Sequence, residues 1–196
     1  TGLVSTGDTW VLQNPDLGPE TSLNVDAGFK VRYGRYTGGF SVFRNSVDGL
    51  IALEFLGEDP DTGLLLSRFE NIDQAILQGA EFELQAFLTP AWTAFGTASY
   101  TRGTDDTTGE PLGLIPPFKA VVGVRYDGSS WWSELGTRIV ARQDRIPPDT
   151  VADTYEETPG FTVWDIRAGA SLGAGFHLQV AVDNLLDKAY HEPFNN

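Results

Sequence analysis

Cysteine and methionine are both absent from the 196 residues of this sequence. Without cysteine the chain has no disulfide bond, no thiolate nucleophile and no cysteine-based metal site. Without methionine it contains no translation start, so we expect a mature protein or an internal segment of one. No segment approaches the ~20 consecutive apolar residues that a transmembrane helix needs, and no signal-peptide pattern opens the chain. These absences exclude a helical membrane protein.

Positive charge is also scarce. Thirteen Lys and Arg residues stand against 27 Asp and Glu residues, which gives a net charge of −14. Nucleic-acid binding needs cationic side chains that neutralise phosphates, so we expect no nucleic-acid partner. Most acidic side chains fall in segments predicted below to be loops, where solvated carboxylates are the simplest interpretation and cation binding is the alternative.

Alternation of apolar and polar residues is the strongest pattern in the sequence. In residues 23–33, Leu, Val, Ala, Phe, Val and Tyr alternate with Asn, Asp, Gly, Lys and Arg. A period of two places these sets on opposite faces of a β-strand, whereas a helix would mix them. The same period recurs at 78–88, 118–126, 164–172 and 176–183, and more weakly at 36–45, 92–102 and 131–142. Eight strands are therefore predicted, each with one apolar and one polar face.

The connections between these strands alternate in length. The short ones are residues 34–35, 89–91, 127–130 and 173–175, and the long ones are roughly 50–75, 103–117 and 143–160. Short periplasmic turns and long outer loops are typical of outer-membrane barrels, so we predict an all-β fold, an antiparallel transmembrane β-barrel segment. The strands predicted to run outward end near Leu50, Arg102, Arg142 and Tyr190. Both termini are then expected on the outer side, as in a piece of a larger barrel.

Aromatic residues gather near the predicted strand ends, as they do in the interfacial girdles of membrane barrels. They are Tyr33, Trp92, Tyr100, Tyr126, Trp131, Trp164, Phe176 and Tyr190. A soluble β-sandwich also alternates and could bury these rings in its core, so this alternative stays open.

Two further alternatives concern the barrel itself. A complete eight-stranded barrel, serving as an adhesin or a structural protein, could close on its own. The chain ends in Phe194-Asn195-Asn196, however, without a terminal strand that closes on an aromatic residue. An outer-membrane barrel enzyme would need a nucleophile and a base, but no His lies at strand spacing from a candidate Ser, and we predict no enzymatic activity.

Four local motifs carry a family resemblance. They are NPDLGPETS at 14–22, FRNSVDGLI at 43–51, NIDQAILQGAE at 71–81 and VDNLLDKAY at 182–190. In this order and spacing they resemble the carboxy-terminal half of TonB-dependent outer-membrane receptors. The stretches at 100–103, 109–112, 115–117, 142–145 and 158–161 are more similar to the haem, haemoglobin and transferrin receptor group than to siderophore receptors.

The resemblance implies a plugged barrel of about 22 strands, of which residues 1–196 would form part of a single domain, without the plug and the remaining strands. It also implies active uptake of an iron-containing ligand, either a ferric siderophore or haem, across the bacterial outer membrane. The expected partners are the TonB system, acting through the plug, the ligand, and outer-membrane lipid. No cofactor is implied.

Candidate ligand-binding residues lie near the predicted outer end. Arg138, Arg142 and Arg145 could contact an anionic ferric chelate or haem propionates, since guanidinium groups make bidentate contacts with such anions; salt bridges within the lumen are the alternative. His191 could ligate haem iron, although a lone His is more often a surface residue. Tyr155 could stack on a planar ligand, as could three further aromatic residues in predicted loops, namely Trp10, Phe55 and Phe69.

Overall fold

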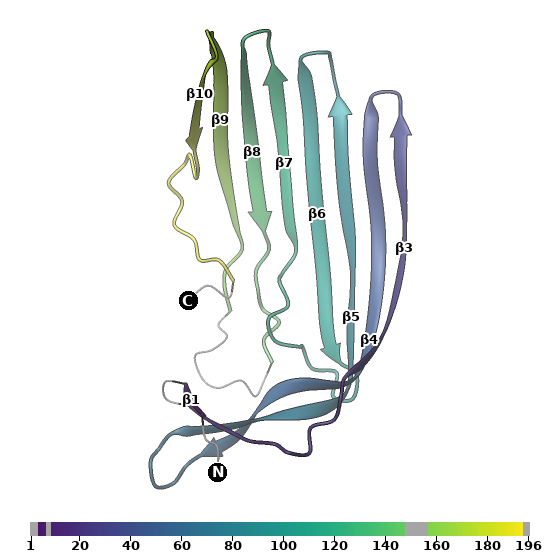
Figure 1. Ribbon diagram of the computed structural model, residues 1–196, viewed down its shortest axis with the longest axis vertical. Coiled ribbons are helices and arrows are strands. Elements are labelled where there is room, and N and C mark those ends of the chain that lie inside the picture. The colour runs from purple at the N-terminus through teal and green to yellow at the C-terminus, as the bar shows by residue number, and fades with distance from the viewer. Residues whose placement is uncertain (1–3, 7–8, 148–156, 194–196) are drawn as a thin grey trace.

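The computed structural model describes residues 4–6, 9–147 and 157–193, which form one sheet of ten β-strands (Figure 1). The strands are β1 (Val4–Thr6), β2 (Thr9–Leu12), β3 (Thr21–Tyr33), β4 (Tyr36–Glu58), β5 (Leu65–Phe87), β6 (Trp92–Asp105), β7 (Lys119–Asp127), β8 (Trp131–Val140), β9 (Phe161–Gly173) and β10 (Phe176–Val182). None of the described residues belongs to a helix long and apolar enough to cross a membrane. The predicted all-β class is confirmed, with the eight predicted strands present as β3 to β10.

Strands β3 to β10 form an antiparallel meander in which each strand pairs with the next one along the chain. Short turns join the strands at one end of the sheet, and the longer connections lie at the other end, together with β1 and the segment after β10 (Figure 1). Neither β3 nor β10 has a second partner among the described strands, so this part of the chain is an open wall rather than a closed small barrel.

The two faces of this wall differ as the alternation predicts. The register aligns Phe29, Phe40 and Phe82 across β3, β4 and β5 on one face, where their side chains are 64%, 38% and 45% exposed. A two-layer sandwich would bury such a row against a second sheet, but the described residues form only one sheet, so the sandwich alternative is wrong. An exposed apolar face this extensive is typical of contact with lipid.

The prediction of a loop at residues 50–75 is wrong. Strands β4 and β5 stay paired from Tyr36 and Ala86 out to Glu58 and Leu65, and their outer halves project beyond the other strands (Figure 1). This projection is rich in Leu, Ile and Phe but lacks strict alternation, which is why a period of two does not reveal it. Strand propensity and a paired backbone ladder are sufficient to extend a hairpin where no apolar medium imposes a single apolar face.

The amino-terminal hairpin extends the projection along the edge of β5. Strand β1 pairs antiparallel with β2, and β2 runs parallel to β5, so the sheet is not antiparallel throughout. Residues 13–20 then cross to β3, which lies beside β4. Asn71 holds this crossing in place: its Oδ1 accepts from the Gly18 N–H at 2.7 Å, while its Nδ2 donates to the carbonyl oxygens of Gly18 at 3.1 Å and Gly49 at 2.6 Å.

The last strand is shorter than predicted. Strand β10 ends at Val182, and the chain turns instead of running outward to Tyr190. Asn184 adopts a φ of 53°, in the left-handed region that Asn tolerates better than most residues. Its side chain accepts from the Lys188 N–H at 3.0 Å and donates to the Lys188 carbonyl at 2.9 Å, which closes the turn. The turn lets the following residues reach β8 and β9.

A small apolar core forms where this carboxy-terminal segment meets the sheet. Val140, Phe161 and Val163 are buried, and Tyr190 packs against them. The Phe161 and Tyr190 rings are stacked with their centroids 4.3 Å apart. Elsewhere the described wall is a single layer, so this cluster anchors the segment after β10 to the polar face.

Candidate functional site

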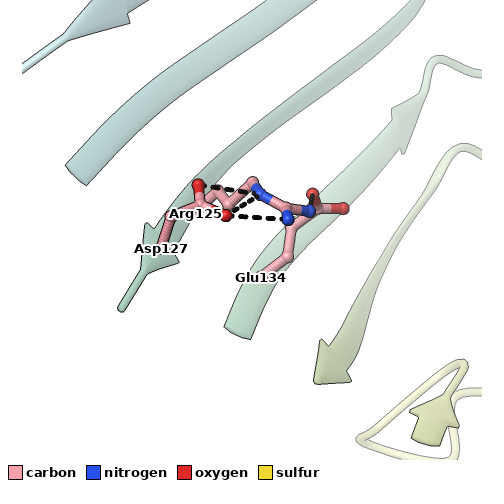
Figure 2. A network of polar contacts seen from close by, with 3 residues as sticks. All are labelled: Arg125, Asp127 and Glu134. Atoms are coloured by element: carbon pink, nitrogen blue, oxygen red, sulfur yellow. Dashed lines mark hydrogen bonds and ion pairs between the residues drawn. The ribbon is translucent and has the colours of Figure 1, made fainter. Parts of the chain in front are cut away.

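The polar face of the wall carries a charged network near the short-turn end (Figure 2). Arg125 of β7 donates from Nε and Nη2 to Asp127 Oδ1 at 2.9 and 2.8 Å, and its Nη1 lies 3.6 Å from Glu134 Oε2 on β8. The guanidinium also lies 4.2 Å from the centroid of the Trp132 ring. These mutually satisfied charges orient one another and leave no free cation here for an incoming anion.

A second feature of the polar face is an acidic pair in the middle of the wall. Glu81 and Glu83 of β5 face small residues on both neighbouring strands, with Lys30 and Lys119 one strand further out on either side. Together these elements line a hollow of about 750 Å³. The predicted polar face thus carries charges of both signs, in contrast to the apolar opposite face.

The candidate residue Arg138 is committed to contacts within the chain. Its guanidinium forms an ion pair with Glu192 and donates to the Tyr190 hydroxyl at 3.1 Å. It also lies 5.3 Å from the centroid of the Phe161 ring and 5.4 Å from that of Tyr190. Arg138 therefore fastens the carboxy-terminal segment to the polar face of β8, and this agrees with the salt-bridge alternative considered for it.

Arg142 lies just beyond the end of β8 and is the most accessible of the three candidate arginines. It pairs with Glu157, and the two side chains are 60% and 53% exposed. The hydrogen bond to Glu157 raises the pKa of the Arg142 guanidinium above its ordinary value, so this group stays cationic. Exposed ion pairs of this kind are weak, and an anionic ligand could replace Glu157 at little cost.

Arg145 belongs to a packed junction between two outer connections. Its Nη2 donates to the Gly103 carbonyl at 3.2 Å and lies 3.4 Å from Thr104 Oγ1. The neighbouring Gln143 is buried and donates from Nε2 to the Ile115 carbonyl at 3.1 Å. Arg142 and Arg145 both line a cavity of about 170 Å³ at this junction, so the structure brings these two candidates together.

The remaining candidates are less well placed to act together. His191 is exposed and adjoins Glu192 in the carboxy-terminal segment, while Tyr155 lies outside the described residues. Phe55 and Phe69 lie on strands β4 and β5 rather than in a loop. No group of three or more His, Cys, Asp or Glu residues that could hold a metal ion occurs in the described part of the chain.

The carboxylates that pair with Arg138 and Arg142 could not be predicted from the sequence. Glu157 is 15 residues from Arg142, and Glu192 is 54 residues from Arg138. Both lie in irregular segments, where no period assigns a face. Tyr190 falls within the motif at 182–190, but its packing on Phe161 leaves no local signal.

Comparison with known proteins yields relatives over most of the chain. A curated relative, the ferric enterobactin receptor PirA of Pseudomonas aeruginosa, is 26% identical over 98% of this chain and 27% of its own length. The ferrienterobactin receptor of Escherichia coli K12 is 24% identical over 94% of this chain and 26% of its own length. The chain thus spans about a quarter of these relatives.

Solved structures reproduce the same wall. The copper transporter OprC superposes with a TM-score of 0.82 and 25% identity, covering 92% of this chain and 27% of that protein. The siderophore receptor PirA from Acinetobacter baumannii superposes with a TM-score of 0.71 and 22% identity, covering 91% of this chain and 29% of that protein. The family profile described as "TonB dependent receptor-like, beta-barrel" matches residues 2–185. With its single wall, polar inner face and exposed apolar outer face, this chain belongs to the family of TonB-dependent receptor β-barrels.

Proposed function

We propose that the whole protein is an outer-membrane receptor that takes up a ferric siderophore and is energised through TonB. The observation that carries this proposal is the two-faced wall, whose apolar side chains are exposed on one side while charges of both signs line the other. Such a wall fits a barrel that is surrounded by lipid and holds a hydrated lumen. In this proposal the protein binds and admits a ligand and catalyses no reaction.

The ligand class follows from the relatives. Both curated relatives are named as receptors for ferric enterobactin, which is an anionic iron chelate, and these names favour a siderophore over haem. Copper is the second candidate, because the copper transporter OprC superposes with a TM-score of 0.82. These 196 residues contain no Met or Cys, which are the soft ligands preferred by Cu(I), so this part of the chain favours the iron chelate.

We further propose that the ligand contacts the outer end of the wall. Arg142 is the strongest candidate, since it is exposed and its only described ion-pair partner, Glu157, is also exposed. Arg145 lines the same junction and Arg138 lies nearby on β8, so both could support a bound anion by positioning the loops. Tyr155 and His191 remain proposed contacts for a planar ligand.

Uptake by the full-length receptor tests this proposal. The receptor is produced in a bacterial strain that lacks its own ferric-siderophore and haem receptors, and uptake of radiolabelled ferric enterobactin, haem and copper is measured with TonB present and absent. We expect TonB-dependent uptake of the ferric siderophore. Uptake of copper or haem instead would replace the proposed ligand, and uptake that is independent of TonB would contradict the energised mechanism.

Arg142→Gln tests the proposed contact. Loss of one charge-assisted hydrogen bond at an exposed position should raise the apparent KM for the ferric chelate by about tenfold, with maximal uptake unchanged. The matched control is Arg35→Gln, because Arg35 lies in a short turn at the opposite end of the wall. Equal KM values for the two variants would mean that Arg142 does not contact the ligand. If haem is the ligand, His191→Ala should lower haem binding.

A further inference from the structure

Three polar side chains lie just beyond the exposed apolar residues on the outward face of the wall, at its long-loop end. Arg44 of β4 pairs in register with Gln78 of β5, and Gln78 pairs with Arg102 of β6. All three are exposed. Because alternate residues of a strand share a face, all three lie on the same side as the exposed apolar row. We call Arg44, Gln78 and Arg102 the outer arginine row.

The outer arginine row lies at the boundary of the apolar face. Two residues closer to the short turns, the same three strands carry Val42, Ala80 and Tyr100, which are also paired in register. Val42 and Tyr100 are 41% and 45% exposed. The row is therefore the first polar position on each strand past the apolar face, at the depth where lipid chains would give way to headgroups.

The geometry of the row allows it to bind an anion. Arg44 Nη1 donates to Gln78 Oε1 at 3.0 Å, so its guanidinium leans toward the middle strand. Neighbouring strands lie ~4.8 Å apart, which puts the Cα atoms of Arg44 and Arg102 about 10 Å from each other, within reach of one shared anion. Gln78 Nε2 is still available as a third donor.

The charges around the row also favour an anion. Neither Arg44 nor Arg102 forms an ion pair with a carboxylate of the described residues. The next outward positions on the three strands are neutral, namely Ser46, Ile76 and Thr104. The first carboxylates beyond them are Asp48, which already accepts from Gln74 at 2.7 Å, and Asp106, which follows the end of β6. In a chain with a net charge of −14, two neighbouring cations thus lack an ion pair within the described part of the chain.

We propose that the outer arginine row binds a phosphate group of an anionic glycolipid in the outer leaflet. Guanidinium groups match phosphate oxygens with paired, charge-assisted hydrogen bonds, and the adjoining apolar row would contact the acyl chains of the same lipid. The proposal deepens the proposed function, because it rests on the outer-membrane location, and it assigns these residues to the lipid rather than to the transported ligand.

Lipid binding by the full-length receptor in detergent tests the row directly. The probes are bis-phosphorylated lipid A, the same glycolipid after removal of its phosphates, and inorganic phosphate as competitor. Bound lipid is counted by native mass spectrometry across a lipid titration. We expect the double variant Arg44→Gln with Arg102→Gln to weaken lipid A binding by about tenfold and to leave binding of the dephosphorylated lipid unchanged.

The matched control removes the same charge from the inward face with Arg32→Gln and Arg167→Gln, and should bind lipid A like the parent. Equal lipid A binding by the two double variants would overturn the inference, as would displacement of lipid A by millimolar inorganic phosphate alone. Uptake is scored separately. If lipid binding depends on the arginines but no ferric siderophore is taken up, the proposed function alone is contradicted. If uptake is normal but lipid binding does not depend on the arginines, only this inference is contradicted.

Discussion

The inner and outer halves of β4 and β5 belong to the same two strands, yet their sequences follow different rules. In the wall, Phe40 and Phe82 lie in register on one exposed apolar face, and polar residues alternate with them. In the projection, apolar residues such as Leu53 and Phe69 are paired without such alternation. The backbone ladder continues through both halves. Strict alternation therefore reports a strand between two different media, and its loss does not mean that the strand has ended.

The largest expected effect comes from placing a charge on each half of β5. Phe82 and Phe69 are 45% and 43% exposed, so they differ in surroundings rather than in accessibility. Phe82→Arg should destabilise the full-length receptor in lipid vesicles by about 2–4 kcal/mol, because a cation would enter the apolar slab. Phe69→Arg should cost less than about 1 kcal/mol. Unfolding by guanidinium in vesicles measures both free energies. Equal losses of stability would contradict the proposed difference between the wall and the projection.

Packing on the polar face of the wall should give the next largest effect. Gly123 and Gly136 are directly paired on β7 and β8. A Cβ at Gly123 would lie 2.5 Å from the Phe95 ring and 2.8 Å from the Leu135 carbonyl, whereas a Cβ at Gly136 would meet nothing closer than 4.0 Å. Gly123→Ala should therefore cost about 1–3 kcal/mol in the same unfolding assay. Gly136→Ala is the control and should change stability by less than about 0.5 kcal/mol; a similar loss for both would refute the packing argument.

A third prediction separates the projection from the wall. Asn71→Ala removes two hydrogen bonds to Gly18 in the crossing at residues 13–20 and one to Gly49 of β4, and it should cost about 1–3 kcal/mol locally. Limited proteolysis should then cut within residues 13–20 at least several times faster, while global unfolding of the wall stays unchanged. Gln74→Ala, which loses one exposed bond to Asp48, is the control. A lower global stability in Asn71→Ala would mean that projection and wall unfold as one unit.

The smallest expected effect is a pH response at the tip of the projection. The backbone N–H groups of Thr62 and Asp61 donate to Asp59 Oδ1 at 2.9 Å each, and these bonds lower the pKa of the Asp59 carboxyl. A depressed folded-state pKa stabilises the turn above the unfolded value of about 3.9, and this contribution disappears as the pH falls through the folded-state pKa. Amide protection at residues 59–64, measured as exchange relative to an unstructured peptide at the same pH, should fall below about pH 4 in the parent. In Asp59→Ala it should be low at neutral and at acidic pH alike. Equal exchange in both proteins at neutral pH would contradict this.

Prediction from the sequence succeeded in the strands whose residues alternate between an apolar and a polar environment. The faces of β3, β7 and β9, and the short turns between strands, follow from residues that are neighbours in sequence, because a period of two is a local property. Prediction failed at residues 50–75 and at the end of β10. In both places the outcome depends on contacts with distant segments, such as the parallel pairing of β2 with β5.

The candidate site likewise divides into what local sequence predicts and what contacts between distant segments decide. The sequence identifies Arg138, Arg142 and Arg145 as cations near the outer end, but it does not distinguish them. In the structure Arg138 is fastened to Tyr190 and Glu192, Arg145 supports a loop junction, and Arg142 stays exposed. An arginine is free for a ligand only if no segment folds back onto it, and that depends on the path of the whole chain.

By itself, the sequence determined that this chain forms a wall with one apolar and one charged face, because alternation decides on which side of a strand each residue lies. Only the tertiary structure decided how far β4 and β5 extend, that β2 joins β5 in parallel, and that residues 184–193 return to the polar face. The physical reason is separation along the chain: the bond from Asn71 to Gly18 spans 53 residues and the pair of Arg138 with Glu192 spans 54, and such contacts leave no local pattern.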